Sequence, residues 1–127
     1  MNVRARLSVC TAALATLLAP AAWAQGTTQF RGTIGQQKVT LSIQFEGDAV
    51  LTAHYRYESQ KSDVPVTESK LFGTTVILAD DDGNVFHLHL RRADGVATTE
   101  VKEAALMDGI MNREDLDLPV KMERVKP

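Results

Sequence analysis

The sequence predicts an all-β domain, an antiparallel meander of about seven to eight strands that forms a small barrel or sandwich. After residue 25, apolar side chains alternate with polar ones along most of the chain, as in strands with one buried face. Glycine, Asp and Asn residues separate these alternating stretches, and the intervals are short. Because short turns join antiparallel neighbours, we expect a meander. The pattern does not distinguish a barrel from a sandwich.

The first 24 residues predict a cleavable secretory signal peptide. Arg4 and Arg6 precede an apolar stretch over residues 7–18, and Ala22-Trp23-Ala24 has the A-x-A form of a cleavage site. The apolar stretch is shorter than the roughly 20 residues that span a membrane as a helix. We therefore expect residues 25–127 to form a single periplasmic or secreted domain with no transmembrane anchor after cleavage.

Removal of this signal peptide leaves an acidic, cysteine-free domain. Arg4 and Arg6 account for two of the 14 Lys and Arg residues, so twelve remain against 16 Asp and Glu, a formal charge of minus four. Binding to nucleic acid requires a basic face that displaces counterions, and no segment supplies one. The single cysteine, Cys10, leaves with the signal peptide, so apolar burial alone must stabilise the domain.

The strand candidates share period-two alternation or a short apolar core between turns. In chain order they are Thr28–Ile34, Val39–Phe45, Leu51–Tyr57, Glu68–Gly73, Val76–Leu78, Phe86–Arg91, Met107–Met111 and Val120–Arg124. The clearest is the second, in which Val39, Leu41 and Ile43 alternate with polar residues. The Glu68–Gly73 segment has the weakest pattern.

The segment Thr98–Met107 does not follow the strand pattern. Its residues Lys102–Leu106 are mostly unbranched helix formers, and Gly109 follows closely. These features favour one short helix near residues 98–107, ahead of the strand at Met107–Met111. A strand flanked by a loop is the alternative, because tertiary context overrides helix propensity in many proteins.

The alternating segments resemble a group of small exported bacterial β-domains, mostly of unknown function. The segment Phe30–Gly35 is similar to their opening G-x-I-G hairpin, and Ala53–Tyr57 is similar to their tyrosine strand. Met107–Met111 resembles their late L-x-G-x-W strand, with Met111 in the tryptophan position, and Leu118–Met122 resembles the closing strand. The resemblance implies an antiparallel barrel or sandwich in the cell envelope, and it implies no reaction.

Three histidines are the candidate metal ligands. His87 and His89 lie two residues apart on a predicted strand, so both imidazoles project from one face. His54 lies on the polar face of another predicted strand and would be the third ligand if the sheet brings the two strands together. The alternative is an ordinary solvated face, on which the nearby Arg56 and Arg91 would repel a cation.

The acidic segment Asp80–Asn84 has two interpretations. Its carboxylates are the oxygen ligands that calcium prefers, but the segment lacks the alternating ligand spacing of a helix-loop-helix calcium site. The interpretation we favour is a hairpin turn in which Gly83 or Asn84 takes a positive φ angle.

No segment has the sequence pattern of a catalytic or cofactor site. The domain has no cysteine nucleophile, no serine in a G-x-S-x-G elbow and no phosphate-binding glycine loop before a helix. We therefore predict a non-enzymatic binding domain without a cofactor, whose partner is another envelope protein that it binds as an inhibitor or immunity-type module. The alternatives are a carrier of a small apolar ligand inside the barrel, and a histidine-based metal-binding protein. The oligomeric state stays open.

Overall fold

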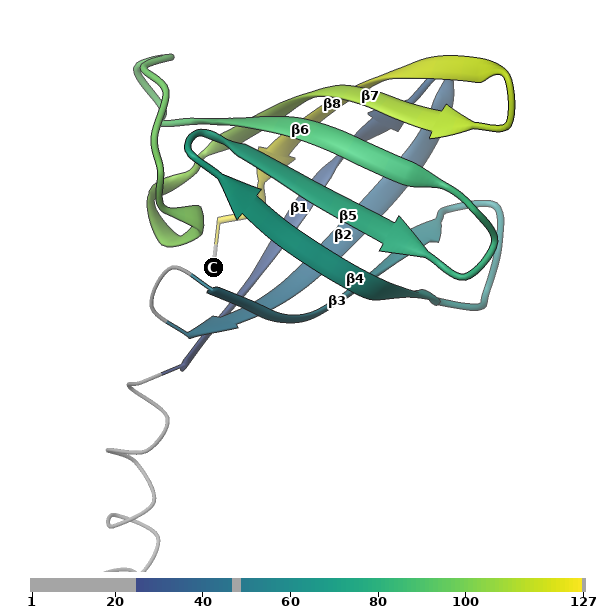
Figure 1. Cartoon of the computed structure of the whole chain (residues 1–127), viewed down its shortest axis with the longest axis horizontal. Helices are drawn as coiled ribbons and strands as arrows, with labels where there is room; N and C mark the ends of the chain where they lie inside the picture. Colours follow the sequence, from purple (N-terminus) through teal and green to yellow (C-terminus); the bar gives the residue numbers. More distant parts are fainter. Residues whose placement is uncertain (1–24, 47–48, 127) are drawn as a thin grey trace, which may run out of the picture.

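The fold is an eight-stranded antiparallel barrel, seen in a computed structural model that describes residues 25–46 and 49–126 (Figure 1). The strands are β1 (Gln25–Ile34), β2 (Gln37–Glu46), β3 (Ala49–Tyr57), β4 (Val64–Phe72), β5 (Thr75–Asp80), β6 (Val85–Arg91), β7 (Leu106–Arg113) and β8 (Leu116–Arg124). Each strand pairs with the next one in the chain, and β8 closes the barrel by pairing with β1. The predicted antiparallel meander is confirmed, and of the two predicted forms it is the barrel. The predicted signal peptide, residues 1–24, lies outside the described residues.

Strand alternation places one continuous core inside the barrel. In β2, Val39, Leu41 and Ile43 are buried while the polar residues between them face outward, as the sequence pattern predicts. The aromatic rings of Tyr55 and Phe86 pack edge to face inside, with centroids 5.1 Å apart. The remaining fully buried large side chains are Phe30, Ile34, Leu78, Leu88, Leu90, Met107 and Met111.

Two strand glycines allow neighbouring strands to approach closely. A Cβ atom on Gly32 in β1 would lie 1.8 Å from the carbonyl oxygen of Lys121 in β8. A Cβ atom on Gly109 in β7 would lie 1.9 Å from the carbonyl oxygen of His87 in β6. Neither position can carry a side chain without a backbone shift, so glycine is required where the sheet coils to close.

The β3–β4 seam is the shortest register in the barrel. It pairs only Ala53–Tyr55 with Val64–Val66, and Pro65 at its centre has no backbone N–H to donate. Beyond it, a bulge between Val66 and Glu68 interrupts the pairing of β4 with β5. Further along β4, Ser69 Oγ donates a hydrogen bond to the backbone carbonyl oxygen of Val50 in β3, at 3.3 Å.

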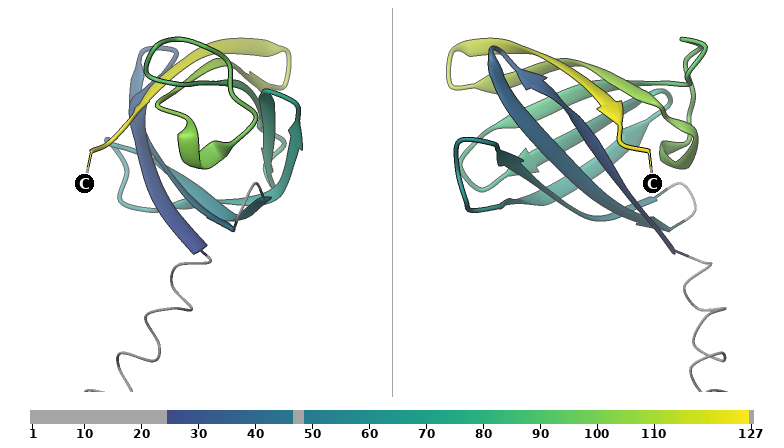
Figure 2. Two further views of the ribbon diagram at one scale, coloured as in Figure 1. Left: turned by 90° about the vertical axis from the view of Figure 1, so that its left-hand side faces the viewer. Right: turned by 180° about the vertical axis from the view of Figure 1, so that it is seen from behind.

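The short helix expected near residues 98–107 is one 3-10 turn, η1 (Val101–Glu103). The residues on either side, Glu100 and Ala104, have extended backbones, so the helix does not propagate. Val101 and Ala104 are fully buried, and η1 lies across the end of the barrel in the left view of Figure 2. Burial of these two apolar side chains against the core therefore decides the conformation over the helix propensity of the segment.

The meander gives the barrel two different ends. Residues 35–36, 58–63, 81–84 and 114–115 connect strands at one end, which we call the turn end. The long β6–β7 connection, the β4–β5 hairpin and the start of β1 lie at the opposite end (Figure 1). Among the described residues, no helix has the length and apolar character needed to cross a membrane.

Candidate interaction surface

Core side chains fill the barrel interior. The inward apolar residues of β2, β5 and β6 are buried and belong to one hydrophobic cluster, and η1 packs Val101 and Ala104 against it. Clefts are found on the outer surface of the barrel, such as one of about 530 Å³ bordered by Arg31, Leu106 and Lys121. A filled interior does not favour the carrier alternative, because an apolar ligand would have to displace packed side chains.

The turn end carries a concentration of carboxylates. Three of its four connections contribute them: Glu58, Asp63, Asp81, Asp82, Glu114 and Asp115. Within these four connections, all of which are described, Lys61 is the only basic residue. The acidic side chains are exposed, whereas Asn84 at the base of the β5–β6 turn is buried. The formal negative charge of the domain is therefore focused at one end of the barrel.

A buried carboxylate fixes the β5–β6 turn. Asp80 Oδ1 accepts hydrogen bonds from the backbone N–H groups of Asp82 at 2.9 Å and Asn84 at 3.0 Å. Asp80 Oδ2 accepts from Asn84 Nδ2 at 2.9 Å and from the Tyr55 hydroxyl at 2.5 Å. The segment Asp80–Asn84 is therefore a turn, as predicted, and its first carboxylate is fully used inside the protein.

The same contacts extend across the barrel to β7. Arg113 Nε donates to Asn84 Oδ1 at 3.1 Å, and Arg113 Nη2 donates to the Tyr57 hydroxyl at 3.3 Å. We call Tyr55, Tyr57, Asp80, Asn84 and Arg113 the turn-end network. It connects β3, the β5–β6 turn and β7, and no buried side-chain nitrogen or oxygen in the described residues lacks a hydrogen-bond partner. The network therefore holds the acidic turns on a fixed base.

The network shifts the pKa values of two of its members. Burial raises the pKa of the Tyr55 phenol well above its ordinary value, and the hydrogen bond to the Asp80 carboxylate adds to this shift. Burial also acts to raise the pKa of Asp80, but hydrogen bonds from Tyr55, Asn84 and Asp82 outweigh it and lower this pKa below 3.8. Near neutral pH, Asp80 is therefore an anion and Tyr55 its neutral donor.

The histidines predicted as metal ligands lie on two separate parts of the barrel. His87 and His89 project outward from β6, as their spacing predicts, and both are exposed. His54 projects from β3, and β4 and β5 separate it from β6. In residues 25–46 and 49–126, no group of three or more His, Cys, Asp or Glu side chains could hold a metal ion. The structure does not bring the three histidines together.

The structure does bring His54 close to groups that the sequence could not place. A polar cleft of about 220 Å³ on the outside of β1–β3 is lined by Gln29, Thr40, Ser42, His54, Arg56 and Asp63. Ser42 and His54 are register partners, and His54 Nε2 lies 3.7 Å from Asp63 Oδ2. That contact is longer than a hydrogen bond, and both side chains are about half exposed, at 48% and 51%. The Ser42 hydroxyl accepts a hydrogen bond from Gln29 at 3.4 Å instead. These contacts do not form the ordered chain of hydrogen bonds that activates a serine nucleophile.

The sequence interpretation missed the turn-end network. Alternation places Tyr55 on the inward face, yet nothing in the sequence shows that its hydroxyl meets Asp80, 25 residues later. A usable signal is that Asp80 continues the inward positions Val76 and Leu78, so the strand pattern itself directs a carboxylate into the barrel.

Comparison with known proteins finds no matching family model, no matching curated protein and no matching solved structure.

Proposed function

We propose that the chain is an exported, non-enzymatic binding module that recognises a basic protein of the cell envelope through its acidic turn end. The observation that carries this proposal is the concentration of exposed carboxylates on three turns at one end of a barrel whose interior is filled. A periplasmic inhibitor or immunity-type role for a lytic or toxic enzyme is the form of this function that we favour.

Two physical properties of the turn end support recognition of a protein. A focused negative potential accelerates association with a basic partner and discriminates against acidic ones. The turn-end network holds the β5–β6 turn through hydrogen bonds to β3 and β7, so few backbone degrees of freedom are lost on binding. Rigid scaffolds that present functional turns are common among binding domains.

The test is capture of a partner from an envelope extract at low salt, with matched charge variants. In Asp81→Lys/Asp82→Lys the four turn-end connections change from a formal charge of minus five to minus one, while in the control Asp94→Lys/Glu103→Lys the same change of four charges is made in the β6–β7 connection at the opposite end. We expect wild type and control to capture the same basic protein and the turn-end variant to lose it. Raising the salt to about 0.5 M should release the partner, because the Debye length falls to a few ångströms.

Two results would contradict the proposal. One is equal capture by the turn-end variant and the control, which would show that Asp81 and Asp82 make no contact with the partner. The other is a captured partner whose binding is insensitive to salt, because an electrostatically directed contact between exposed charges is screened.

A further inference from the structure

One inward-facing apolar side chain is left uncovered at the turn end. Along β8 the inward positions become more exposed: Met122 and Val120 are buried, Leu118 is partly buried and Leu116 is 62% exposed. The register of β7 with β8 continues without a bulge to the pair Arg113–Leu116, so Leu116 keeps the inward direction. Leu116 therefore lies past the rim of the barrel, over its mouth, and not on the outer wall.

The backbone next to Leu116 is strained. The two-residue turn Glu114–Asp115 joins β7 to β8. Glu114 holds φ 53°, the only positive φ of a non-glycine residue in the part of the chain that the structure describes. A left-handed backbone costs free energy in any residue with a side chain, and strain of this kind accumulates at sites of function. The β7–β8 hairpin thus combines two unfavourable features, a strained turn and an exposed leucine.

Carboxylates flank Leu116 on the exposed surface. Glu114 and Asp115 precede it, Asp117 follows it, and all three side chains are exposed. The acidic β5–β6 turn lies at the same end, and the turn-end network links it to β7. An exposed apolar side chain bordered by charged ones has the composition of an interface centre with a polar rim.

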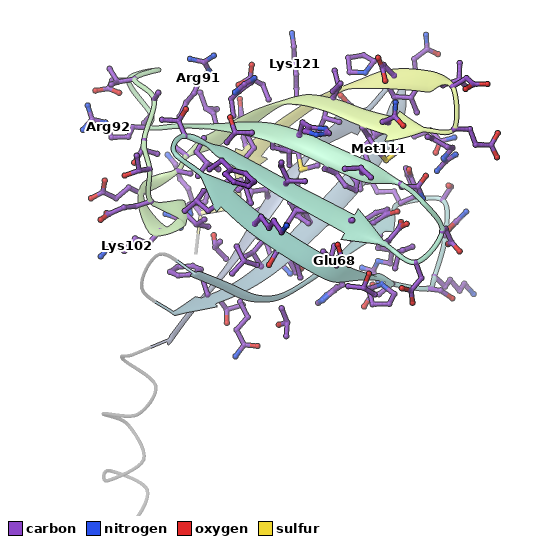
Figure 3. All side chains as sticks on the ribbon, in the orientation of Figure 1. Glu68, Arg91, Arg92, Lys102, Met111 and Lys121 are labelled. Carbon is purple, nitrogen blue, oxygen red and sulfur yellow. The ribbon has the colours of Figure 1, made fainter. Side chains whose placement is uncertain are left out.

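Little positive charge lies near this surface. Arg113 is the register partner of Leu116, but its guanidinium already donates hydrogen bonds within the turn-end network. Among the other cations, Arg91 and Arg92 lie at the opposite end of the barrel (Figure 3). The four turn-end connections hold six carboxylates against Lys61 alone, a formal charge of minus five. A partner that covers Leu116 must match this charge with lysine or arginine side chains.

We infer that Leu116 is the anchor of the proposed contact and inserts into an apolar pocket of the partner that is bordered by lysine or arginine side chains. This inference rests on the proposed function and specifies the surface that the partner presents. The carboxylates and the leucine contribute differently. Exposed charges at the rim accelerate association and make it sensitive to salt. An apolar side chain in a closed pocket mainly slows dissociation, because its burial is lost only when the complex separates.

The test is binding kinetics by surface plasmon resonance, with protein recovered from cells that express the full chain. The probe is the protein that wild type captures at low salt, identified by mass spectrometry and purified. Leu116→Ala should raise the dissociation rate about tenfold or more and leave the association rate and its salt dependence close to wild type. Phe72→Ala is the matched control and should bind as wild type. Phe72 is 61% exposed, but it lies at the β4–β5 hairpin at the opposite end.

Leu116→Asp separates an apolar contact from a purely electrostatic one. It adds a carboxylate to a surface that a basic partner approaches, so association should be as fast as wild type or faster. Dissociation should nevertheless be at least as fast as in Leu116→Ala, because a carboxylate in an apolar pocket is poorly solvated. Tighter binding by this variant would overturn the inference. Circular dichroism and a thermal melt confirm that each variant is folded.

The remaining outcomes separate this inference from the proposed function. Equal dissociation rates for Leu116→Ala and Phe72→Ala, with a salt-sensitive complex that Asp81→Lys/Asp82→Lys loses, would overturn the inference and leave the proposed function supported. No captured protein at low salt would contradict the proposed function, and the inference falls with it. Hydrogen–deuterium exchange on the probe should protect an apolar pocket bordered by Lys or Arg residues. Protection of a surface without such a pocket would also overturn the inference.

Discussion

Removal of the Tyr55 hydroxyl tests whether the turn-end network holds the acidic end of the barrel together. In Tyr55→Phe the ring keeps its packing on Phe86, and the hydroxyl loses its 2.5 Å hydrogen bond to Asp80 Oδ2 together with a long one, at 3.5 Å, that it accepts from Asn84 Nδ2. Hydrogen bonds to charged groups contribute about 1.5–3 kcal/mol. Because Asn84 Nδ2 still donates to the same oxygen, we expect a loss near the lower end of that range, about 2 kcal/mol.

The expected loss is large enough to measure by heat or denaturant. For a domain of about 100 residues, 1 kcal/mol shifts the unfolding midpoint by roughly 4–8 °C, so the variant should melt about 8–16 °C below wild type. The matched control is Tyr57→Phe, which removes a partly buried hydroxyl bonded to Arg113 at 3.3 Å. Arg113 is charged, but its side chain is exposed and the bond is long, so water can replace the lost acceptor at a cost of about 0.5–1.5 kcal/mol. This control should therefore melt at a higher temperature than Tyr55→Phe.

A double-mutant cycle with Asp80→Asn assigns the effect to the bond itself. If Tyr55 acts through Asp80, the two substitutions together should cost less than the sum of their separate costs, with a coupling of about 1 kcal/mol or more. The reasoning would be refuted if Tyr55→Phe and Tyr57→Phe melted alike, or if the cycle showed purely additive effects. Either result would mean that ring packing, not the carboxylate contact, accounts for the stability contribution of Tyr55.

The remaining predictions concern pH and backbone geometry. The lowered pKa of Asp80 stabilises the folded state at pH values above 3.8, the ordinary pKa of the group, and this stabilisation is lost as the pH falls through the pKa of the folded protein. Tyr55→Phe removes part of it, so acid unfolding followed by circular dichroism should have its midpoint at a higher pH. The raised pKa of Tyr55 adds stability that is lost above about pH 10, so the difference in melting temperature between wild type and Tyr55→Phe should shrink in alkaline buffer. In a urea titration, Gly32→Ala should lower the free energy of unfolding by about 3 kcal/mol or more, because its Cβ atom would lie 1.8 Å from the Lys121 carbonyl oxygen. Gly83→Ala should lower it by only about 1 kcal/mol, because Gly83 has φ 87° but no atom lies near its Cβ position. Glu114→Gly should raise the melting temperature by a few degrees, since Glu114 holds φ 53° and glycine removes about 0.5–1 kcal/mol of strain.

Much of the barrel could be predicted from period-two alternation. The predicted strand Val39–Phe45 lies within β2, and Phe86–Arg91 lies within β6, because each has one buried and one solvated face. The closure of the sheet could not be predicted in this way, because pairing of β1 with β8 is a contact between the two ends of the domain. The close approach at Gly32 that accompanies closure likewise depends on the position of β8.

Local signals were less informative where tertiary packing decides the structure. The segment Lys102–Leu106 has helix propensity, but burial of Val101 and Ala104 against the core leaves only one 3-10 turn there. The outward direction of Ile77 could not be predicted for a related reason. Ile77 lies in an apolar run, Val76–Ala79, in which alternation does not show which side chains face outward. The register with β6 and β7 reveals that Ile77 shares its face with Ile110.

From the short register between β3 and β4, we expect the native state to open first at this seam. Local unfolding requires the fewest broken contacts at this seam, since the inward residues of β4 are only partly buried and Pro65 donates no hydrogen bond. Amide protons of residues 67–72 should exchange with deuterium faster than those of β2 or β6, where longer ladders must break together. A protease added to the folded protein would then cut β4 before any other strand, so the meander has a built-in site of fraying although its sheet is closed.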